Sequence, residues 1–203
     1  EIQRLTTALI MKLSNSDPKN IFGPIYIIKN EPEDSIIKDL KEFSTLINCC
    51  GRLNRSSVAI GICLNDKYSR EKASELIREY RKEIMNNLEW FYSNRGHEKV
   101  KEFEGFVLIN AEGSIKDALI GTITSMISKS GIYTDGTIII SMAHNLEGNS
   151  KISARISGYN VKNINAKEVL QNICTGLDAE LGGHNNAAGA IISQADEELF
   201  IKK

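Results

Sequence analysis

The spacing of apolar residues divides the chain into a helical N-terminal part and a C-terminal part where helices and strands alternate. Helical spacing predicts three N-terminal helices, over residues 2–13, 35–50 and 69–94. Ser35 is the expected N-cap of the second helix, and Gly51 is the expected residue just beyond its end. The apolar run 25–28 predicts a short strand, whereas the run 58–64 fits a helix or a strand equally well.

The helix predicted over 69–94 is the longest in the chain. Its apolar stripe contains Ala73, Leu76, Ile77, Tyr80, Ile84, Leu88 and Phe91. A helix of about 25 residues is close to 40 Å long at about 1.5 Å per residue. This length suits a connector between two domains, and Arg95 and Gly96 follow its expected end.

Short apolar runs alternate with helical patterns from Phe106 onward. Strands are predicted over 106–109, 137–142, 151–157 and 191–193, and helices over 115–128 and 166–177. Ser114 and Asn165 are the expected N-caps, and Gly131 is expected to end the first of these helices. A helical turn over 196–202 closes the chain. The β-α-β-β-α-β order predicts an α+β fold in which a long connector helix precedes a small mixed-sheet domain.

Composition is that of a globular protein with a real core, because 41% of its 203 residues are apolar and 25% are charged. The formal net charge of −1 means that any nucleic-acid affinity must come from a local patch. The four cysteines have no C-x-x-C spacing, so we interpret them as reduced thiols in a cytoplasmic protein. The chain begins with Glu1 rather than methionine, which is typical of a fragment or a trimmed chain.

The stretch 182–190 combines small residues with consecutive polar side chains. Gly182 and Gly183 allow close backbone approach, and His184, Asn185 and Asn186 follow as donors. We interpret the stretch as a loop between the last long helix and a short strand. Two interpretations of this stretch remain open. It is either a loop that receives a phosphate or a tight turn with a solvated histidine.

The strand predicted over 151–157 carries a second group of polar residues. Ser153, Arg155 and Ser157 share one face by the two-residue period of a strand. An arginine between two hydroxyl groups can cradle a phosphodiester oxygen, although a lone arginine also fits the wet face of a sheet. Two phosphate-suited elements in one small domain favour binding.

The sequence contains no complete active site that we recognise. The histidines are His97, His144 and His184, and none has an aspartate at ligand spacing as a two-metal site requires. We interpret His144 as a surface or packing residue, and Cys63 and Cys174 as core residues. A nucleophilic G-x-S-x-G motif is also absent from the sequence.

Three segments together resemble the DHH phosphoesterase family. Gly182-Gly183-His184-Asn185-Asn186-Ala187-Ala188-Gly189, with Ser153-Ala154-Arg155 upstream, resembles the G-G-H-x-x-A-A-G motif of its substrate-binding domain. Ile47-Asn48-Cys49-Cys50-Gly51-Arg52-Leu53 resembles the N-a-x-G-R-L segment of RecJ-type members, and helix 69–94 resembles their connector. From about Lys29 onward, the chain is most similar to archaeal RecJ-like proteins of the GINS-associated nuclease type.

The resemblance implies three regions. Residues 1–66 would be the tail of a catalytic domain and a linker, 67–103 the connector helix, and 104–203 the DHH-associated nucleic-acid-binding domain. The family's catalytic D-H-H motif and its manganese-binding aspartates are missing from the sequence. The parent protein would then be a single-strand exonuclease that uses Mn²⁺ or Mg²⁺, and this chain alone would be inactive and hold no cofactor.

The resemblance also implies roles for individual residues. Gly182, Gly183, His184 and Asn185 would hold the terminal phosphate or nucleotide, and Arg155 would contact a neighbouring phosphate. Ser153, Ser157 and Arg52 complete the expected site. The implied function is binding of single-stranded DNA or RNA ends in DNA replication or repair.

Two alternatives remain open at this point. One is a non-catalytic scaffold of an archaeal replication complex that binds GINS and MCM. The other is a small-nucleotide phosphoesterase whose metal site does not match a known motif.

Overall fold

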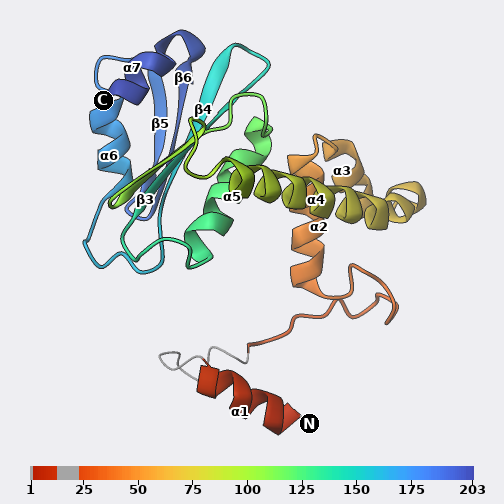
Figure 1. The fold of residues 1–203 in the computed structure, drawn as a ribbon. Helices are drawn as coiled ribbons and strands as arrows, with labels where there is room; N and C mark the ends of the chain where they lie inside the picture. The colour runs from red at the N-terminus through yellow and green to blue at the C-terminus, as the bar shows by residue number, and fades with distance from the viewer. Residues whose placement is uncertain (1, 13–22) are drawn as a thin grey trace. The chain divides into compact units, whose positions relative to one another are not determined.

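The computed structural model describes residues 2–12 and 23–203, and the chain forms two compact units, Glu1–Ile77 and Arg78–Lys203 (Figure 1). Helix α4 (Lys67–Asn94) confirms the long helix predicted over 69–94. The boundary between the two units lies inside this helix. Among the described residues, no helix combines the length and the apolar character that crossing a membrane requires. The two units are described separately below.

The N-terminal unit is helical. It contains α1 (Ile2–Lys12), α2 (Leu40–Arg52), α3 (Ser56–Cys63) and the first turns of α4. Helix α1 confirms the first prediction as far as Lys12, and residue 13 lies outside the described residues. Helix α3 resolves the ambiguous run 58–64 as a helix. The strand predicted over 25–28 is wrong, since only one bridge, between Ile27 and Asp39, is found there.

Helix α2 begins at Leu40, five residues after the start predicted at residue 35. Its N-cap is Asp39, whose carboxylate accepts hydrogen bonds from the backbone N–H groups of Lys41 and Glu42 at 2.7 and 3.3 Å. Ser35 instead lies in the preceding turn, where its hydroxyl donates to Glu31 Oε2 at 2.9 Å. Gly51 lies within the helix, which ends at Arg52. Asp39 takes the capping role because its carboxylate bonds two amides that would otherwise lack partners.

The C-terminal unit contains a six-stranded mixed sheet in the order β1-β2-β3-β4-β6-β5. The strands are β1 (Val100–Phe103), β2 (Phe106–Asn110), β3 (Ile138–His144), β4 (Asn149–Ile156), β5 (Ala179–His184) and β6 (Ala187–Ser193). Strands β2 and β3 are parallel, and every other neighbouring pair is antiparallel. The mixed sheet after a long helix confirms the predicted fold class.

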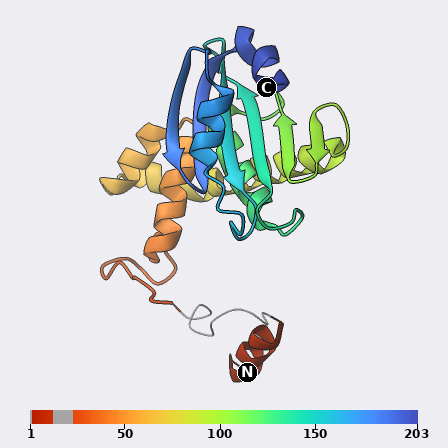
Figure 2. The ribbon, with the colours of Figure 1, turned by 90° about the vertical axis from the view of Figure 1, so that its left-hand side faces the viewer.

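Helices cover both faces of this sheet (Figures 1 and 2). On one face, α5 (Asp117–Lys129) and residues 80–91 of α4 bury an apolar cluster that includes Phe91, Leu119 and Ile139. On the other face, α6 (Ala166–Ile173) and α7 (Glu197–Lys202) bury a second cluster around Ile152, Leu170 and Phe200. A short 3₁₀ helix, η2 (Gln194–Asp196), leads from β6 into α7.

Two predictions for this unit are wrong, and one strand was not predicted. Strand β1 was not predicted, since only Val100 in its sequence Val-Lys-Glu-Phe is buried. Ser114 does not cap α5, which begins after Lys116 without a side-chain cap. The stretch 182–190 is not a loop, because its small residues belong to the hairpin β5–β6. Small side chains obscured the strand pattern there, and pairing with β4 supplies what propensity lacks. Asn165 does cap α6, as predicted.

Candidate nucleic-acid interface

Strand pairing brings the predicted polar residues into two adjacent rows across β4, β6 and β5. Arg155 lies opposite Ala187, which lies opposite His184. The second row lies two positions further along each strand. In it, Ser153 lies opposite Gly189, which lies opposite Gly182. Positions two apart in a strand share a face, so both rows lie on the side of the sheet that α5 covers. We call these six residues the glycine shelf.

The two glycines of the motif have different surroundings. Gly183 has φ +140°, and a Cβ atom there would lie 2.4 Å from the Cα atom of Ala188. A side chain at position 183 therefore conflicts with the neighbouring strand. A Cβ atom at Gly182 would meet nothing within 4 Å. Gly183 has a structural reason to be glycine, whereas Gly182 leaves open space above the shelf.

Ser153 carries a hydroxyl group that is buried without a hydrogen-bond partner. The residue is 5% exposed, and its Oγ atom has no partner among the described residues. It lies beside Gly121 of α5, where a Cβ atom would be 3.6 Å from Ser153 Oγ. An unsatisfied buried hydroxyl costs about 1–3 kcal/mol, so such groups commonly mark a site where a ligand or water supplies the missing bond.

The guanidinium group of Arg155 is oriented by the backbone around it. Its Nη1 atom donates to the carbonyl oxygens of Ala154 at 2.7 Å and Ala188 at 3.2 Å. A Cβ atom at Gly121 would lie 3.8 Å from Arg155 Nη2, so the group also lies against α5. A guanidinium group has five N–H donors in a fixed plane, and these two bonds hold that plane at the edge of the shelf.

The turn of the β5–β6 hairpin is tied to neighbouring segments. The carbonyl oxygen of Asn185 accepts from Ala166 N at 2.8 Å, and that of Asn186 accepts from Ile156 N at 3.3 Å. The side chain of Asn160 donates to Asn186 Oδ1 at 2.9 Å. His184 Nδ1 accepts from Asn186 N at 3.4 Å, which assigns the ring proton to Nε2 in the neutral form. The exposed imidazole therefore offers an N–H donor.

A cavity of about 370 Å³ adjoins the shelf at the turn. Ser125, Ser128 and Lys129 line it from α5, and Arg155, Tyr159 and Asn186 line it from the sheet side. Lys129 and Arg155 place two cations at this cavity, and exposed Tyr159 adds an aromatic ring. Sequence analysis did not identify Lys129 or Tyr159, because a lysine in the last turn of a helix and a tyrosine in a loop have no distinguishing pattern.

Two of the predicted site residues are part of neither the shelf nor its hairpin. Ser157 follows β4 and is fully buried, and its hydroxyl is directed at the carbonyl oxygens of Tyr133 at 3.1 Å and Ser128 at 3.3 Å. It is thus engaged with the backbone. Arg52 is the last residue of α2, is exposed and belongs to the N-terminal unit. The shelf itself unites Gly182, His184, Ser153 and Arg155, while Gly183 and Asn185 shape its hairpin.

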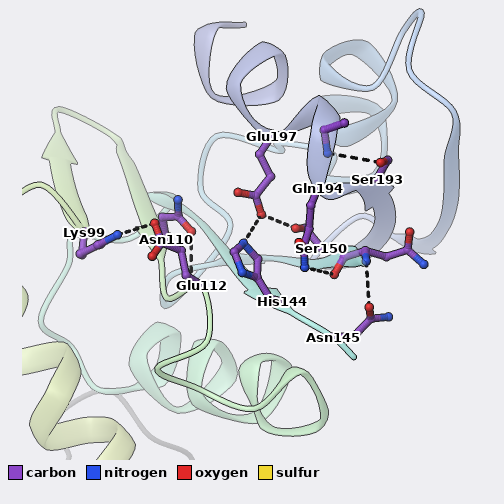
Figure 3. Close-up of polar contacts among 11 residues, drawn as sticks. Lys99, Asn110, Glu112, His144, Asn145, Ser150, Ser193, Gln194 and Glu197 are labelled. Atoms are coloured by element: carbon purple, nitrogen blue, oxygen red, sulfur yellow. Dashed lines mark hydrogen bonds and ion pairs between the residues drawn. The ribbon is translucent and has the colours of Figure 1, made fainter. Parts of the chain in front are cut away.

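A second polar cluster lies at the other end of β3 and β4 (Figure 3). His144 Nε2 is 2.8 Å from Glu197 Oε1, and the hydroxyl of Ser150 donates to the same oxygen. The serine and the histidine both contact the carboxylate rather than each other, unlike a nucleophile that a histidine activates. This contact attaches the start of α7 to the sheet, and Glu197 was not identified from the sequence.

The described residues contain no group of three or more histidine, cysteine, aspartate or glutamate side chains that could hold a metal ion.

The hairpin, the shelf and the surrounding sheet can be compared with known proteins. Residues 104–203 match the family model of the DHHA1 domain. The matched residues contain β2 to β6, the glycine shelf and the cavity at the turn.

Two further comparisons extend beyond the DHHA1 domain. An uncharacterized protein of Methanocaldococcus jannaschii is 26% identical over 202 residues, which are 99% of this chain and 41% of that protein. RecJ from Thermus thermophilus, in complex with Mn²⁺, is 17% identical with a TM-score of 0.56, covering 79% of this chain and 22% of that one.

Another exonuclease RecJ structure, bound to manganese, is 20% identical with a TM-score of 0.54, covering 79% of this chain and 38% of that one. The chain thus spans less than half the length of these relatives. At these identities, the similarity to the RecJ exonucleases is one of fold.

Proposed function

We propose that the glycine shelf binds the phosphate of a single-stranded nucleic-acid end, as the substrate-binding part of a RecJ-like exonuclease. The observation that carries this proposal is the unpartnered hydroxyl of Ser153, buried between Gly121 and the shelf. A phosphate oxygen beside Gly189, the residue paired with Ser153, would accept a hydrogen bond from this hydroxyl. The match to the DHHA1 domain and the fold similarity to RecJ exonucleases support a role in a phosphoesterase.

Each polar group on the shelf has a part in this proposal. Gly182 lets the sugar-phosphate backbone approach the strand, because no side chain stands there. The guanidinium charge of Arg155 would attract the phosphate, and the Nε2–H of His184 would donate to one of its oxygens. The cavity beside Lys129 and Tyr159 would receive the adjoining nucleotide, with the tyrosine ring offering a stacking surface.

In this proposal the regions of the chain have distinct roles. Residues 1–66 form the tail of a catalytic domain and a linker, 67–103 the connector, and 104–203 the binding domain. Arg52, within the G-R-L segment, would add a phosphate contact from the linker. Hydrolysis would need Mn²⁺ or Mg²⁺ in the whole protein. The described residues do not fit a metal site, so no hydrolytic step is assigned to them.

Fluorescence anisotropy with a labelled single-stranded oligonucleotide tests the proposal. Arg155→Ala and His184→Ala should each weaken binding about tenfold, because each removes a contact of about 1–3 kcal/mol. Arg81→Ala, at an exposed position on α4, is the matched control and should bind as wild type does. Affinity should fall as the salt concentration rises. Arg155→Ala should make this dependence of affinity on salt less steep. Wild-type binding by both shelf variants would refute the assignment.

A scaffold role in a replication complex is the second candidate, and the net charge of −1 favours it, since nucleic-acid-binding domains are usually basic. In that case the chain would co-elute with purified GINS or MCM subunits during gel filtration and would show little affinity for oligonucleotides. Oligonucleotide binding that depends on Arg155, without co-elution, decides for the first proposal.

A further inference from the structure

An apolar cavity of about 340 Å³ lies on the face of the sheet opposite the glycine shelf. We call it the β1–α7 groove and define it by Phe103, Phe106, Ile173, Ile201, Lys101 and Lys203. Helix α6 packs on β4, β5 and β6, and on the β1–β2 part of this face Phe103 is exposed and Phe106 is partly exposed. In Figure 2, the β1–β2 hairpin extends beyond α6 on this face.

The groove has an aromatic rim that is open to solvent. Phe103 is 57% exposed and stacks on Phe106 with 6.0 Å between the ring centroids and 22° between the ring planes. Exposed aromatic residues beside an apolar depression are characteristic of protein interaction sites. Because Phe103 is more than half exposed, the groove does not enclose a free small molecule. It suits a side chain that remains attached to a larger chain.

The far wall of the groove is fixed in place. Phe200 of α7 is 3% exposed and lies in the apolar cluster under α6. Glu197, at the start of α7, bonds His144 and Ser150 on the sheet (Figure 3). At the other end of α7, the ammonium group of Lys203 donates to the carbonyl oxygen of Thr175. These contacts hold the groove in a preformed shape, which lowers the cost of binding.

The charges at the groove are positive and are not neutralised by carboxylates. Lys101 has no ion-pair partner among residues 23–203, and Lys203 bonds only a backbone carbonyl. Glu102, the residue after Lys101, is bound by Arg95 and Tyr133 instead. Among the residues that the structure describes, no aspartate or glutamate lines the cavity. The groove thus combines an apolar floor with two unpaired lysine charges from different walls.

We propose that the β1–α7 groove binds a peptide segment of a partner protein in which large apolar side chains lie beside acidic residues. The apolar side chains would enter between Phe106 and Ile173, and the carboxylates would pair with Lys101 and Lys203. Charge complementarity selects acidic over basic peptides. This surface lies on the opposite side of the sheet from the shelf, so the proposal does not depend on nucleic-acid binding.

The test uses the whole chain and a fluorescein-labelled peptide with aspartates on both sides of a leucine and a phenylalanine. Two matched peptides replace either the aspartates by lysines or the apolar residues by serines. Anisotropy should report binding of the first peptide and at least about tenfold weaker binding of the other two. Lys101→Glu and Phe103→Ser should each weaken binding of the first peptide about tenfold.

Two exposed positions of the same unit away from the groove provide controls, Lys82→Glu on α4 for the charge and Leu146→Ser for the apolar side chain. Both should bind the first peptide as wild type does. Failure of this peptide to bind, or equal binding of the lysine peptide, would overturn the proposal. A concentration-dependent dimer that Phe103→Ser abolishes would assign the groove to a second copy instead. Oligonucleotide binding should be unchanged in Phe103→Ser, which keeps the two proposals separable.

Discussion

Gly182 of β5 lies directly opposite Gly189 of β6, so two facing residues on adjacent strands both lack a side chain. The next pair, Gly183 and Ala188, faces the opposite side of the sheet and is so closely spaced that a Cβ atom at 183 would lie 2.4 Å from Ala188 Cα. Adjacent glycines of one motif therefore perform separate tasks, one exposing backbone and one permitting strand packing.

Alanine substitutions at the two glycines should affect different quantities, the stability at Gly183 and the oligonucleotide affinity at Gly182. Gly183→Ala should lower the free energy of unfolding by about 3 kcal/mol, because the new methyl group conflicts with β6 and the φ of +140° is unfavourable. Gly182→Ala should change it by less than about 1 kcal/mol, yet weaken oligonucleotide binding. Urea unfolding and anisotropy separate the two effects. Equal stability of both variants would contradict the steric assignment.

Removing the hydroxyl of Ser153 should stabilise the protein and impair the site. Ser153→Ala eliminates an unsatisfied buried group, so the free energy of unfolding should rise by about 1 kcal/mol while oligonucleotide affinity falls. Ser157→Ala is the matched control, because its buried hydroxyl already bonds backbone carbonyls. That variant should lose about 1 kcal/mol of stability and keep its affinity. Thermal melts with and without oligonucleotide report both quantities.

The Arg95–Glu102–Tyr133 cluster predicts a specific acid sensitivity. The hydrogen bond from Arg95, with a second from Tyr133, holds the pKa of Glu102 below its ordinary value of 4.5. A carboxylate with a depressed folded-state pKa contributes stability above the unfolded pKa and loses that contribution as pH falls through the folded one. Wild type should therefore lose stability below about pH 4.5 more steeply than Glu102→Gln does.

At neutral pH, Glu102→Gln should cost only about 1 kcal/mol, since the side chain is partly exposed and solvent screens the pair. Urea titrations at a series of pH values measure the difference. Glu198, whose pair with Lys202 is largely exposed to solvent, offers a comparison, because Glu198→Gln should leave the acid limb unchanged. Identical acid limbs for wild type and Glu102→Gln would contradict this prediction.

The attachment of α7 can be measured by hydrogen exchange. Glu197→Ala removes the acceptor of His144 and Ser150 and should accelerate amide exchange over residues 194–203. Glu198→Ala, one residue away, removes only an exposed pair with Lys202 and should leave exchange there unchanged. Similar acceleration in both variants would mean that the carboxylate of Glu197 does not hold α7.

Long periodic segments could be predicted from the sequence, and short or small-residue segments could not. Helix α4 has a sustained apolar stripe, and β3 an apolar run between turn residues, so both were found. Strand β1 carries Lys101 and Glu102 on an edge, where one neighbouring strand and few core contacts define it. The hairpin β5–β6 has glycines and alanines where strands usually have branched side chains, so only its pairing partners reveal it.

The candidate site was predictable in part for the same reason. Arg155 and His184 stood out as polar residues within distinctive patterns, and the register brings them into one row. Ser157 seemed equivalent to Ser153 by strand alternation, yet β4 ends at Ile156 and the next hydroxyl is directed at backbone carbonyls. Which hydroxyl lacks a partner depends on the packing of α5 over β4, and no local sequence pattern encodes that packing.

The anchoring of the hairpin turn has a consequence for the speed of association. Because Asn185 and Asn186 are bonded to Ala166 and Ile156, the turn already has a defined conformation before any ligand arrives. Binding that requires a conformational change of the site is slower, whereas a preformed site binds at a rate set by diffusional encounter and charge. The turn therefore predicts that oligonucleotide binding has a single kinetic phase, whose observed rate rises in proportion to oligonucleotide concentration.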